Sequence, residues 1–242
     1  MKAFLPGCRN SLTTMELFSF TSVFTEVFLF CICTCHLECK YGCIYKLNVG
    51  GIDMKLLIDA ILDKGKILEG NILKVDTIIN HQIDPVLMDQ IGDEFYNHFK
   101  NKGITKVITV ESSGIAPAMM CALKLNVPLL FLKKAQPSTM ANPLTSEVFS
   151  YTKNKQYTLC AERSFIDDND KLLFIDDFLA NGEAFRGVEN IIQQTNAELA
   201  GVGILIEKSF QSGHDYIVNK GYDFYSLANI TSFDDGKITF AE

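Results

Sequence analysis

The sequence lacks the features that define two classes of protein, those that bind along nucleic-acid duplexes and the P-loop proteins. Acidic residues outnumber basic ones, 29 to 22, and the formal net charge is −7. No basic stripe is evident, so a protein that binds along a nucleic-acid duplex is disfavoured. The Gly-x-x-x-x-Gly-Lys-Ser/Thr motif of P-loop proteins is also missing, so a Walker-type phosphate loop is not expected. Any anionic ligand must therefore be held locally.

Cysteine is scarce after residue 43. Only Cys121 and Cys160 occur in the remainder of the chain, whereas six cysteines fall before it. No disulfide framework is expected in the main body, which indicates a reducing compartment and a cytoplasmic protein. The length of 242 residues allows one sizeable core, with room for a small second lobe.

Residues 1–53 differ in composition from the remainder, with abundant Phe and Cys and balanced charges. Leu17 to Cys35 is long and apolar enough for a membrane helix or signal-anchor, although it contains Glu26. A cleaved signal peptide is disfavoured because no Ala-x-Ala-like site precedes Asp53, and a zinc site is disfavoured because no Cys-x-x-Cys pair is present. We interpret residues 1–53 as an atypical leader outside the working domain, which then begins at Met54.

From Met54 onward, the spacing of apolar residues alternates between helical and strand periods. Helices are expected over 54–64, from Asp84-Pro85 to about Phe99, after Gly114, and over 184–194; strands are expected over 106–110, 128–132, 147–151, 156–160, 172–175 and 199–206. Residues 72–80 are expected to be extended or looped. This alternation predicts an α/β fold with a mainly parallel sheet, whose ligands bind at the carboxyl ends of the strands.

Residues 171–187 contain the most informative pattern. Four apolar residues are followed by Asp176 and Asp177, then by the small-residue turn Ala180-Asn181-Gly182, and then by a helix. The amide groups at a helix N-terminus can bind a phosphate, and glycine lets the backbone come close. Paired carboxylates can accept hydrogen bonds from ribose hydroxyls or face a hydrated Mg²⁺. The alternative is an ordinary strand end or a different metal site.

Two further segments follow predicted strands and can meet an anionic ligand. The turn Ser112-Ser113-Gly114 precedes a helix, and Lys133 and Lys134 open a polar loop. Backbone amides in the first and ammonium groups in the second suit a pyrophosphate. Taken alone, the Ser-Ser-Gly segment is also explained as an ordinary turn. The two lysines are also explained as the solvated end of a strand.

Residues 171–187 resemble the phosphoribosyl-pyrophosphate (PRPP) motif of the type I phosphoribosyltransferases. The whole of residues 54–242 is similar to the bacterial xanthine phosphoribosyltransferases within that family. The segments that carry this resemblance are 73–76, 80–85, 111–118, 175–182 and 206–210.

The resemblance implies a type I phosphoribosyltransferase fold, with a central mainly parallel sheet, flanking helices and a small hood. It implies a pentosyltransferase of purine salvage that converts xanthine and PRPP to xanthosine 5′-monophosphate and pyrophosphate, with Mg²⁺, as a homodimer. No protein metal site is implied. The alternatives are a guanine or hypoxanthine enzyme and a PRPP-sensing regulator; the second is disfavoured because the leader has no basic face.

By the same resemblance, Leu73, Asn80 and Lys208 contact xanthine, and Ala180, Asn181, Gly182, Glu183 and Ala184 hold the 5′-phosphate. The resemblance also favours the assignment of Ser112, Ser113, Gly114, Lys133 and Lys134 to the pyrophosphate, which their chemistry suggests. The chemistry of Asp176 and Asp177 makes them the expected catalytic residues. Glutamine is the commoner family residue where Glu183 stands, so we expect its side chain to point away from the phosphate. Phe210 stacks on the base or belongs to the core.

Overall fold

The computed structural model describes residues 55–150, 155–234 and 236–241. The interpretation of residues 1–53 therefore concerns a segment outside the described residues. Residues 151–154, which include the end of the strand expected over 147–151, also lie outside the described residues. No helix within the described residues is long and apolar enough to cross a membrane.

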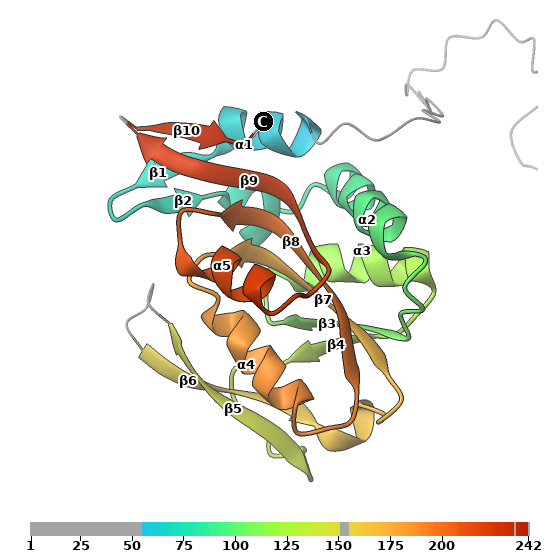
Figure 1. The fold of residues 1–242 in the computed structure, drawn as a ribbon. Coiled ribbons are helices and arrows are strands. Elements are labelled where there is room, and N and C mark those ends of the chain that lie inside the picture. The colour runs from blue at the N-terminus through green and yellow to red at the C-terminus, as the bar shows by residue number, and fades with distance from the viewer. Residues whose placement is uncertain (1–54, 151–154, 235, 242) are drawn as a thin grey trace, which may run out of the picture. The chain divides into compact units, whose positions relative to one another are not determined.

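A six-stranded sheet forms the centre of the domain, with the order β10-β9-β8-β7-β3-β4 (Figure 1). Its strands are β3 (Lys106–Val110), β4 (Leu129–Leu132), β7 (Lys171–Leu179), β8 (Glu198–Lys208), β9 (Phe224–Asp234) and β10 (Lys237–Phe240). All neighbouring pairs are parallel except β9 and β10. The predicted parallel α/β sheet is thus confirmed, with one antiparallel strand at its edge.

Helices cover both faces of this sheet (Figure 1). They are α1 (Lys55–Lys64), α2 (Pro85–Phe99), α3 (Ile115–Leu125), α4 (Glu183–Ile192) and α5 (Ser212–Asn219). Helices α2 and α3 pack into one core cluster, which includes Leu173 and Ile175 of β7. Helices α4 and α5 pack into the other, which includes Leu172 and Phe174 of the same strand. Strand β7 is therefore buried from both sides, as its apolar run predicts.

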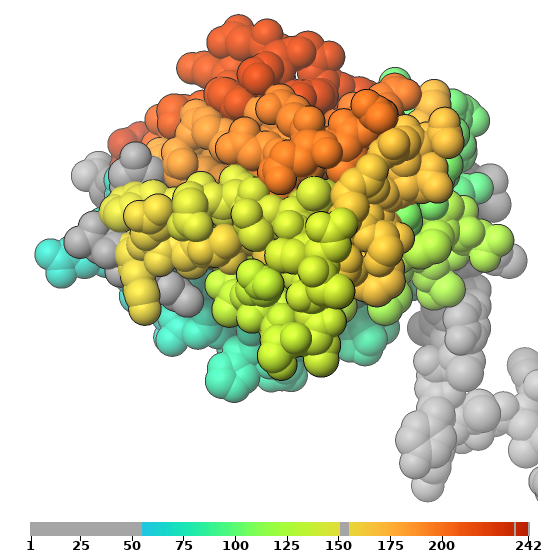
Figure 2. Space-filling model, turned by 90° about the horizontal axis from the view of Figure 1, so that it is seen from below, coloured from blue at the N-terminus to red at the C-terminus, as the bar shows by residue number. Residues whose placement is uncertain are grey.

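Two small antiparallel hairpins complete the fold. Strands β1 (Lys66–Leu68) and β2 (Ile72–Lys74), together with α1 and the short helix η1 (Asp76–Asn80), form the hood. Strands β5 (Pro143–Ser150) and β6 (Lys155–Glu162) form the second hairpin, followed by the short helix η2 (Arg163–Phe165). Figure 2 shows this hairpin (yellow) running across the face beside α4 (orange).

Several predicted helix ends are confirmed by the backbone contacts. The Asp84 carboxylate accepts from the amides of Val86 and Leu87 at 3.0 and 3.2 Å, which caps α2. Gly65 ends α1, donating its amide to Ile61 at 2.8 Å. Helix α2 buries the whole apolar stripe that its spacing predicts, whereas α1 buries Leu57 and Ile61 but leaves Leu62 55% exposed.

Two local predictions need correction. Strand β7 continues to Leu179 rather than ending at Ile175, because its pairing with β8 extends to Leu179 and Glu207. Residues 72–80 are not wholly extended, because they form β2 and then η1.

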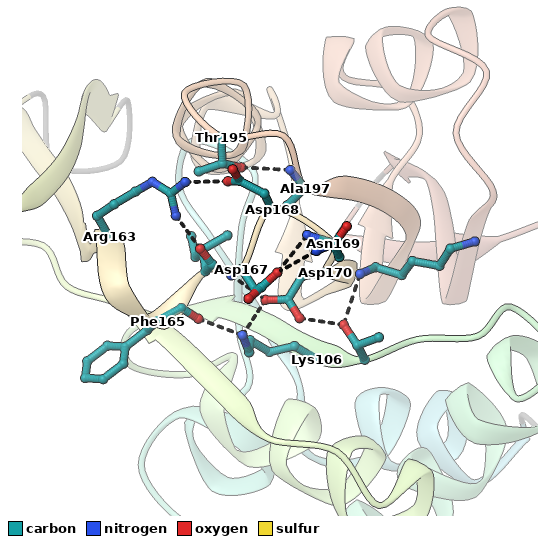
Figure 3. Close-up of polar contacts among 12 residues, drawn as sticks. Lys106, Arg163, Phe165, Asp167, Asp168, Asn169, Asp170, Thr195 and Ala197 are labelled. Atoms are coloured by element: carbon teal, nitrogen blue, oxygen red, sulfur yellow. Dashed lines mark hydrogen bonds and ion pairs between the residues drawn. The ribbon is translucent and has the colours of Figure 1, made fainter.

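A polar network closes the edge of the sheet where β3 and β7 begin (Figure 3). Asp170, which is 8% exposed, accepts from the Thr105 hydroxyl at 2.7 Å, from the Asp167 amide at 2.8 Å and from the Lys106 ammonium. Lys106 also donates to the Phe165 carbonyl oxygen at 2.7 Å. Burial alone would raise the pKa of Asp170, but these hydrogen bonds outweigh burial and lower it.

Candidate functional site

The candidate site lies at the carboxyl ends of four neighbouring strands. The turn after β3, the loop after β4, the turn after β7 and the end of β8 all meet at this edge because the strands are parallel. The segments predicted to hold the phosphate and the pyrophosphate, together with Lys208, lie at these strand ends, whereas Leu73 and Asn80 belong to the hood. The edge shown in Figure 3 is at the opposite ends of the same strands.

The predicted phosphate loop has the backbone geometry of an anion-binding turn. Gly182 has a φ of +83° and directly precedes α4, where no side chain caps the helix. This left-handed backbone conformation is strained for every residue except glycine. The first amides of α4 are therefore without a side-chain cap and are free to bind an anion. The helix begins at Glu183, one residue before the expected Ala184.

The extra carboxylate of this loop, Glu183, is paired within the protein. Its Oε1 atom contacts Nη1 of Arg186, one turn along α4. The same guanidinium nitrogen donates to the Asn181 carbonyl oxygen at 3.0 Å. Arg186 thus neutralises Glu183 and holds the loop backbone, which removes part of the repulsion that a phosphate would meet there.

Asp176 is crowded against the turn that follows β3. A Cβ atom on Gly114 would lie 2.5 Å from Oδ1 of Asp176, so only glycine fits beside this carboxylate. The Asp177 amide donates to the same oxygen at 3.0 Å. Burial raises the pKa of both carboxyl groups, and the charge of Asp177 raises that of Asp176 further. The lowering effect of the Lys134 charge on both pKa values is smaller.

One cavity of about 180 Å³ joins the aspartate and the phosphate loop. Asp176 lines it on one side and Ala180 to Ala184 on the other. Hairpin β5–β6 adds Phe149 and Tyr157, which no motif in the sequence indicates as site residues. Burial raises the pKa of Tyr157, and the charges of Asp176 and Glu183 add to that effect. The alternation of apolar and polar residues in the hairpin predicts its two strands. It does not predict that these strands pack on α4.

The two lysines after β4 point to different places. The Lys134 ammonium lies 5.7 Å from the centre of the Tyr157 ring, and its backbone amide donates to Glu111 at 2.6 Å. The Lys133 ammonium lies 4.9 Å from the centre of the Phe131 ring, on the wall of a separate, mainly apolar cavity. Of the predicted pair, Lys134 is the one near the aspartates.

The end of β8 forms the second half of the site. Lys208 is 9% exposed, and its ammonium lies 5.8 and 5.6 Å from the ring centres of Phe178 and Phe233. It donates to the Asn71 carbonyl oxygen of the hood at 2.9 Å. Burial lowers the pKa of this lysine. Phe210 is 41% exposed and contacts Phe233 edge-on, with 5.5 Å between ring centres, so it is not a core residue.

The remaining predicted residues differ in their burial. Leu73 is 5% exposed and its side chain belongs to the core, so its backbone is the part that a ligand can reach. Asn80 is exposed at the end of η1. Ser112 is exposed and Ser113 half-buried in the turn before α3.

The comparisons with known proteins agree with this geometry. No protein-family model matches the chain. A xanthine phosphoribosyltransferase of Lactobacillus delbrueckii subsp. bulgaricus is 50% identical over 188 residues, which cover 77% of this chain and 100% of that protein. The xanthine phosphoribosyltransferase of Agathobacter rectalis is 52% identical over 190 residues, which cover 78% of this chain and 99% of that protein. That of Acinetobacter baumannii is 51% identical over 190 residues, which cover 78% of this chain and 100% of that protein.

Solved structures share the fold at lower identity. The adenine phosphoribosyltransferase of Trypanosoma brucei in complex with AMP, pyrophosphate and ribose-5-phosphate has a TM-score of 0.61 and 22% identity, covering 74% of this chain and 83% of that one. The enzyme of Giardia lamblia complexed with 9-deazaadenine has a TM-score of 0.61 and 20% identity, covering 73% and 98%. The fold is therefore that of the type I phosphoribosyltransferases, and the chain belongs to the xanthine phosphoribosyltransferase family.

Proposed function

We propose that this protein transfers the phosphoribosyl group of PRPP to xanthine, which yields xanthosine 5′-monophosphate and pyrophosphate in purine salvage. The observation that carries the proposal is the shared cavity of Asp176 and residues 180–184, with Gly182 in a left-handed conformation. A ribose 5-phosphate needs both features, because its hydroxyls require acceptors and its phosphate requires backbone amides.

The reaction needs no nucleophile from the protein. A purine nitrogen forms a bond to the anomeric carbon, the carbon–oxygen bond to pyrophosphate breaks with its electron pair, and the purine nitrogen loses its proton. The ribose carries positive character on the way, so nearby carboxylates stabilise it. In this proposal, Asp176 and Asp177 accept hydrogen bonds from the ribose hydroxyls, while Lys134 and the turn Ser112-Ser113-Gly114 face the leaving pyrophosphate.

Mg²⁺ is proposed to enter with PRPP. Mg²⁺ is commonly held by one or two carboxylates together with substrate phosphates, and it keeps several waters. The described residues contain no cluster of three or more metal-ligating side chains, whereas the aspartate pair supplies the two carboxylates that such a hydrated ion needs. When bound, Mg²⁺ neutralises charge on the pyrophosphate. Undiminished turnover in excess EDTA would contradict this assignment.

The purine is proposed to bind between Lys208 and the hood. The ammonium only donates hydrogen bonds, which suits the carbonyl oxygen at position 6 of the base. Asn80 offers both a donor and an acceptor for the edge near position 2, where xanthine carries its second carbonyl. Leu73 is proposed to contribute through its backbone. Phe178, Phe233 and Phe210 supply aromatic surface around Lys208.

The activity is tested by incubating the purified chain with PRPP, Mg²⁺ and xanthine and measuring pyrophosphate release. The expected result is equimolar pyrophosphate and xanthosine 5′-monophosphate. Release of neither product from xanthine, guanine or hypoxanthine would contradict the proposal and favour a PRPP-sensing regulator.

The assembly and location are also proposals. A homodimer in the cytoplasm follows from the family resemblance, and two free cysteines, Cys121 and Cys160, among the described residues suit a reducing compartment. Light scattering should give twice the mass of one chain, and cell fractionation should recover the protein in the soluble fraction. We also propose that residues 1–53 are not part of the enzyme; a native protein whose N-terminal mass begins at Met1 would contradict that.

A further inference from the structure

Helix α5 supports the phosphate loop from behind. The Gly213 amide donates to the Ala180 carbonyl oxygen at 3.0 Å. A Cβ atom on Gly213 would lie 2.5 Å from that oxygen and 3.0 Å from the Gly182 nitrogen, so the two backbones touch. The Ser212 hydroxyl donates to the Asn181 carbonyl oxygen at 3.4 Å. A shift of the first turn of α5 would therefore move the loop that holds the 5′-phosphate.

His214 connects that first turn to the sheet. Its Nδ1 atom is hydrogen-bonded to Oε1 of Glu207, near the end of β8. The other carboxylate oxygen of Glu207 accepts from the Ser226 hydroxyl at 2.6 Å, and Glu207 is 1% exposed. A buried carboxylate with both oxygens bonded is a costly group to displace, so it is a firm anchor for α5.

Glu207 is also the neighbour of Lys208, the residue proposed to bind the purine. Successive side chains of a strand point to opposite faces. Lys208 is bonded to Asn71 of the hood, and Glu207 is bonded to His214 of α5. The end of β8 thus connects both parts of the site, the hood on one side and the phosphate loop on the other.

We propose that His214 is a positioning residue for PRPP, which fixes the first turn of α5 against residues 180–182 through its hydrogen bond to Glu207. The inference rests on the proposed function, because it assigns the loop to the 5′-phosphate of PRPP. An ionised carboxylate only accepts hydrogen bonds, so the group that matters is an N–H at the position of Nδ1. A side chain that supplies this donor should preserve PRPP binding.

The test compares four variants of the full chain. His214→Ala removes the donor; His214→Asn places an amide nitrogen near the Nδ1 position, and His214→Gln places it near Nε2 instead. Asn219→Ala is the matched control, since Asn219 is exposed at the other end of the same helix. For each protein, the KM for PRPP is measured at saturating xanthine and the KM for xanthine at saturating PRPP, together with the unfolding temperature.

The expected result is a KM for PRPP raised about tenfold in His214→Ala and His214→Gln, since a hydrogen bond to a charged group contributes roughly that factor. The KM for xanthine should stay within about twofold, and His214→Asn should resemble the wild type. Equal changes in both KM values, or a lowered unfolding temperature with unchanged KM values, would overturn the inference. If His214→Ala does not fold, the contrast between Asn and Gln decides. A wild-type protein that releases no pyrophosphate would instead refute the proposed function.

Discussion

The Lys208 ammonium donates a hydrogen bond to the carbonyl oxygen of Asn71 at 2.9 Å. This bond ties the hood to the end of β8, across 137 residues of sequence. It also leaves Lys208 with an acceptor that a purine carbonyl can replace. In the proposed purine site, a carbonyl of the base would take the place of the Asn71 oxygen, so the lysine would keep a hydrogen bond.

Lys208→Ala is expected to weaken use of the purine far more than use of PRPP. The KM for xanthine should rise about 10- to 100-fold, as the loss of a hydrogen bond from a charged donor predicts. The KM for PRPP should change about twofold at most. Lys171→Ala, which removes an exposed lysine at the opposite edge of the sheet, is the control. Equal loss toward both substrates in steady-state kinetics would refute the assignment.

Asp176→Asn is expected to lower turnover while it raises stability. Burial and the Asp177 charge raise the pKa of Asp176 in the folded protein. The folded state therefore holds its proton more tightly than the unfolded state, and stability falls as pH rises through the window between the two pKa values. The amide has no charge to bury, so the unfolding temperature at pH 7 should increase. Turnover should fall because a ribose acceptor is lost; wild-type turnover would contradict the ribose role.

Asp170→Asn is expected to have the opposite effect on stability. The pKa of Asp170 is lowered in the folded state, so its contribution is present above the unfolded pKa and is lost as pH falls through the folded pKa. The variant should lose about 3 kcal/mol in urea unfolding at pH 7, the cost of breaking a buried ion pair. The difference should shrink toward about pH 3, where the unfolded carboxyl is protonated. Both KM values should be unchanged, because Asp170 lies at the far edge of the sheet (Figure 3).

Gly182→Ala is expected to abolish PRPP binding, measured by calorimetry. Its Cβ atom would lie 3.1 Å from Cα of Gly213 and would stand in the phosphate loop. Gly221→Ala is a matched control, because Gly221 has a similar φ of +76° but no atom within 4 Å of the added carbon. The two variants carry the same backbone strain of about 1 kcal/mol. Equal PRPP affinity in both would show that backbone approach at Gly182 is unimportant.

The sequence predicts the segments that surround the site better than the contacts between them. The apolar run before Asp176 and the small turn at Gly182 are local patterns, and each lies where parallel strands place it. The length of the strand is not predictable from local spacing, because pairing with β8 prolongs β7 beyond its apolar run.

The contacts that depend on distant residues were not predictable in this way. Tyr157 reaches the phosphate loop because hairpin β5–β6 packs on α4, and Lys134 differs from Lys133 only in the direction of its side chain. His214 and Glu207 are seven residues apart with a strand end and a turn between them, so only the folded chain brings them together. No sequence period records such contacts.

A competition assay tests the central claim most directly. The protein receives limiting PRPP with equal concentrations of xanthine, guanine and hypoxanthine, and the nucleotide products are separated and quantified. Because the product ratio reports the ratio of kcat/KM values, it isolates purine choice from PRPP binding. The proposed function predicts that xanthosine 5′-monophosphate predominates; a product mixture dominated by the guanine or hypoxanthine nucleotide would contradict it.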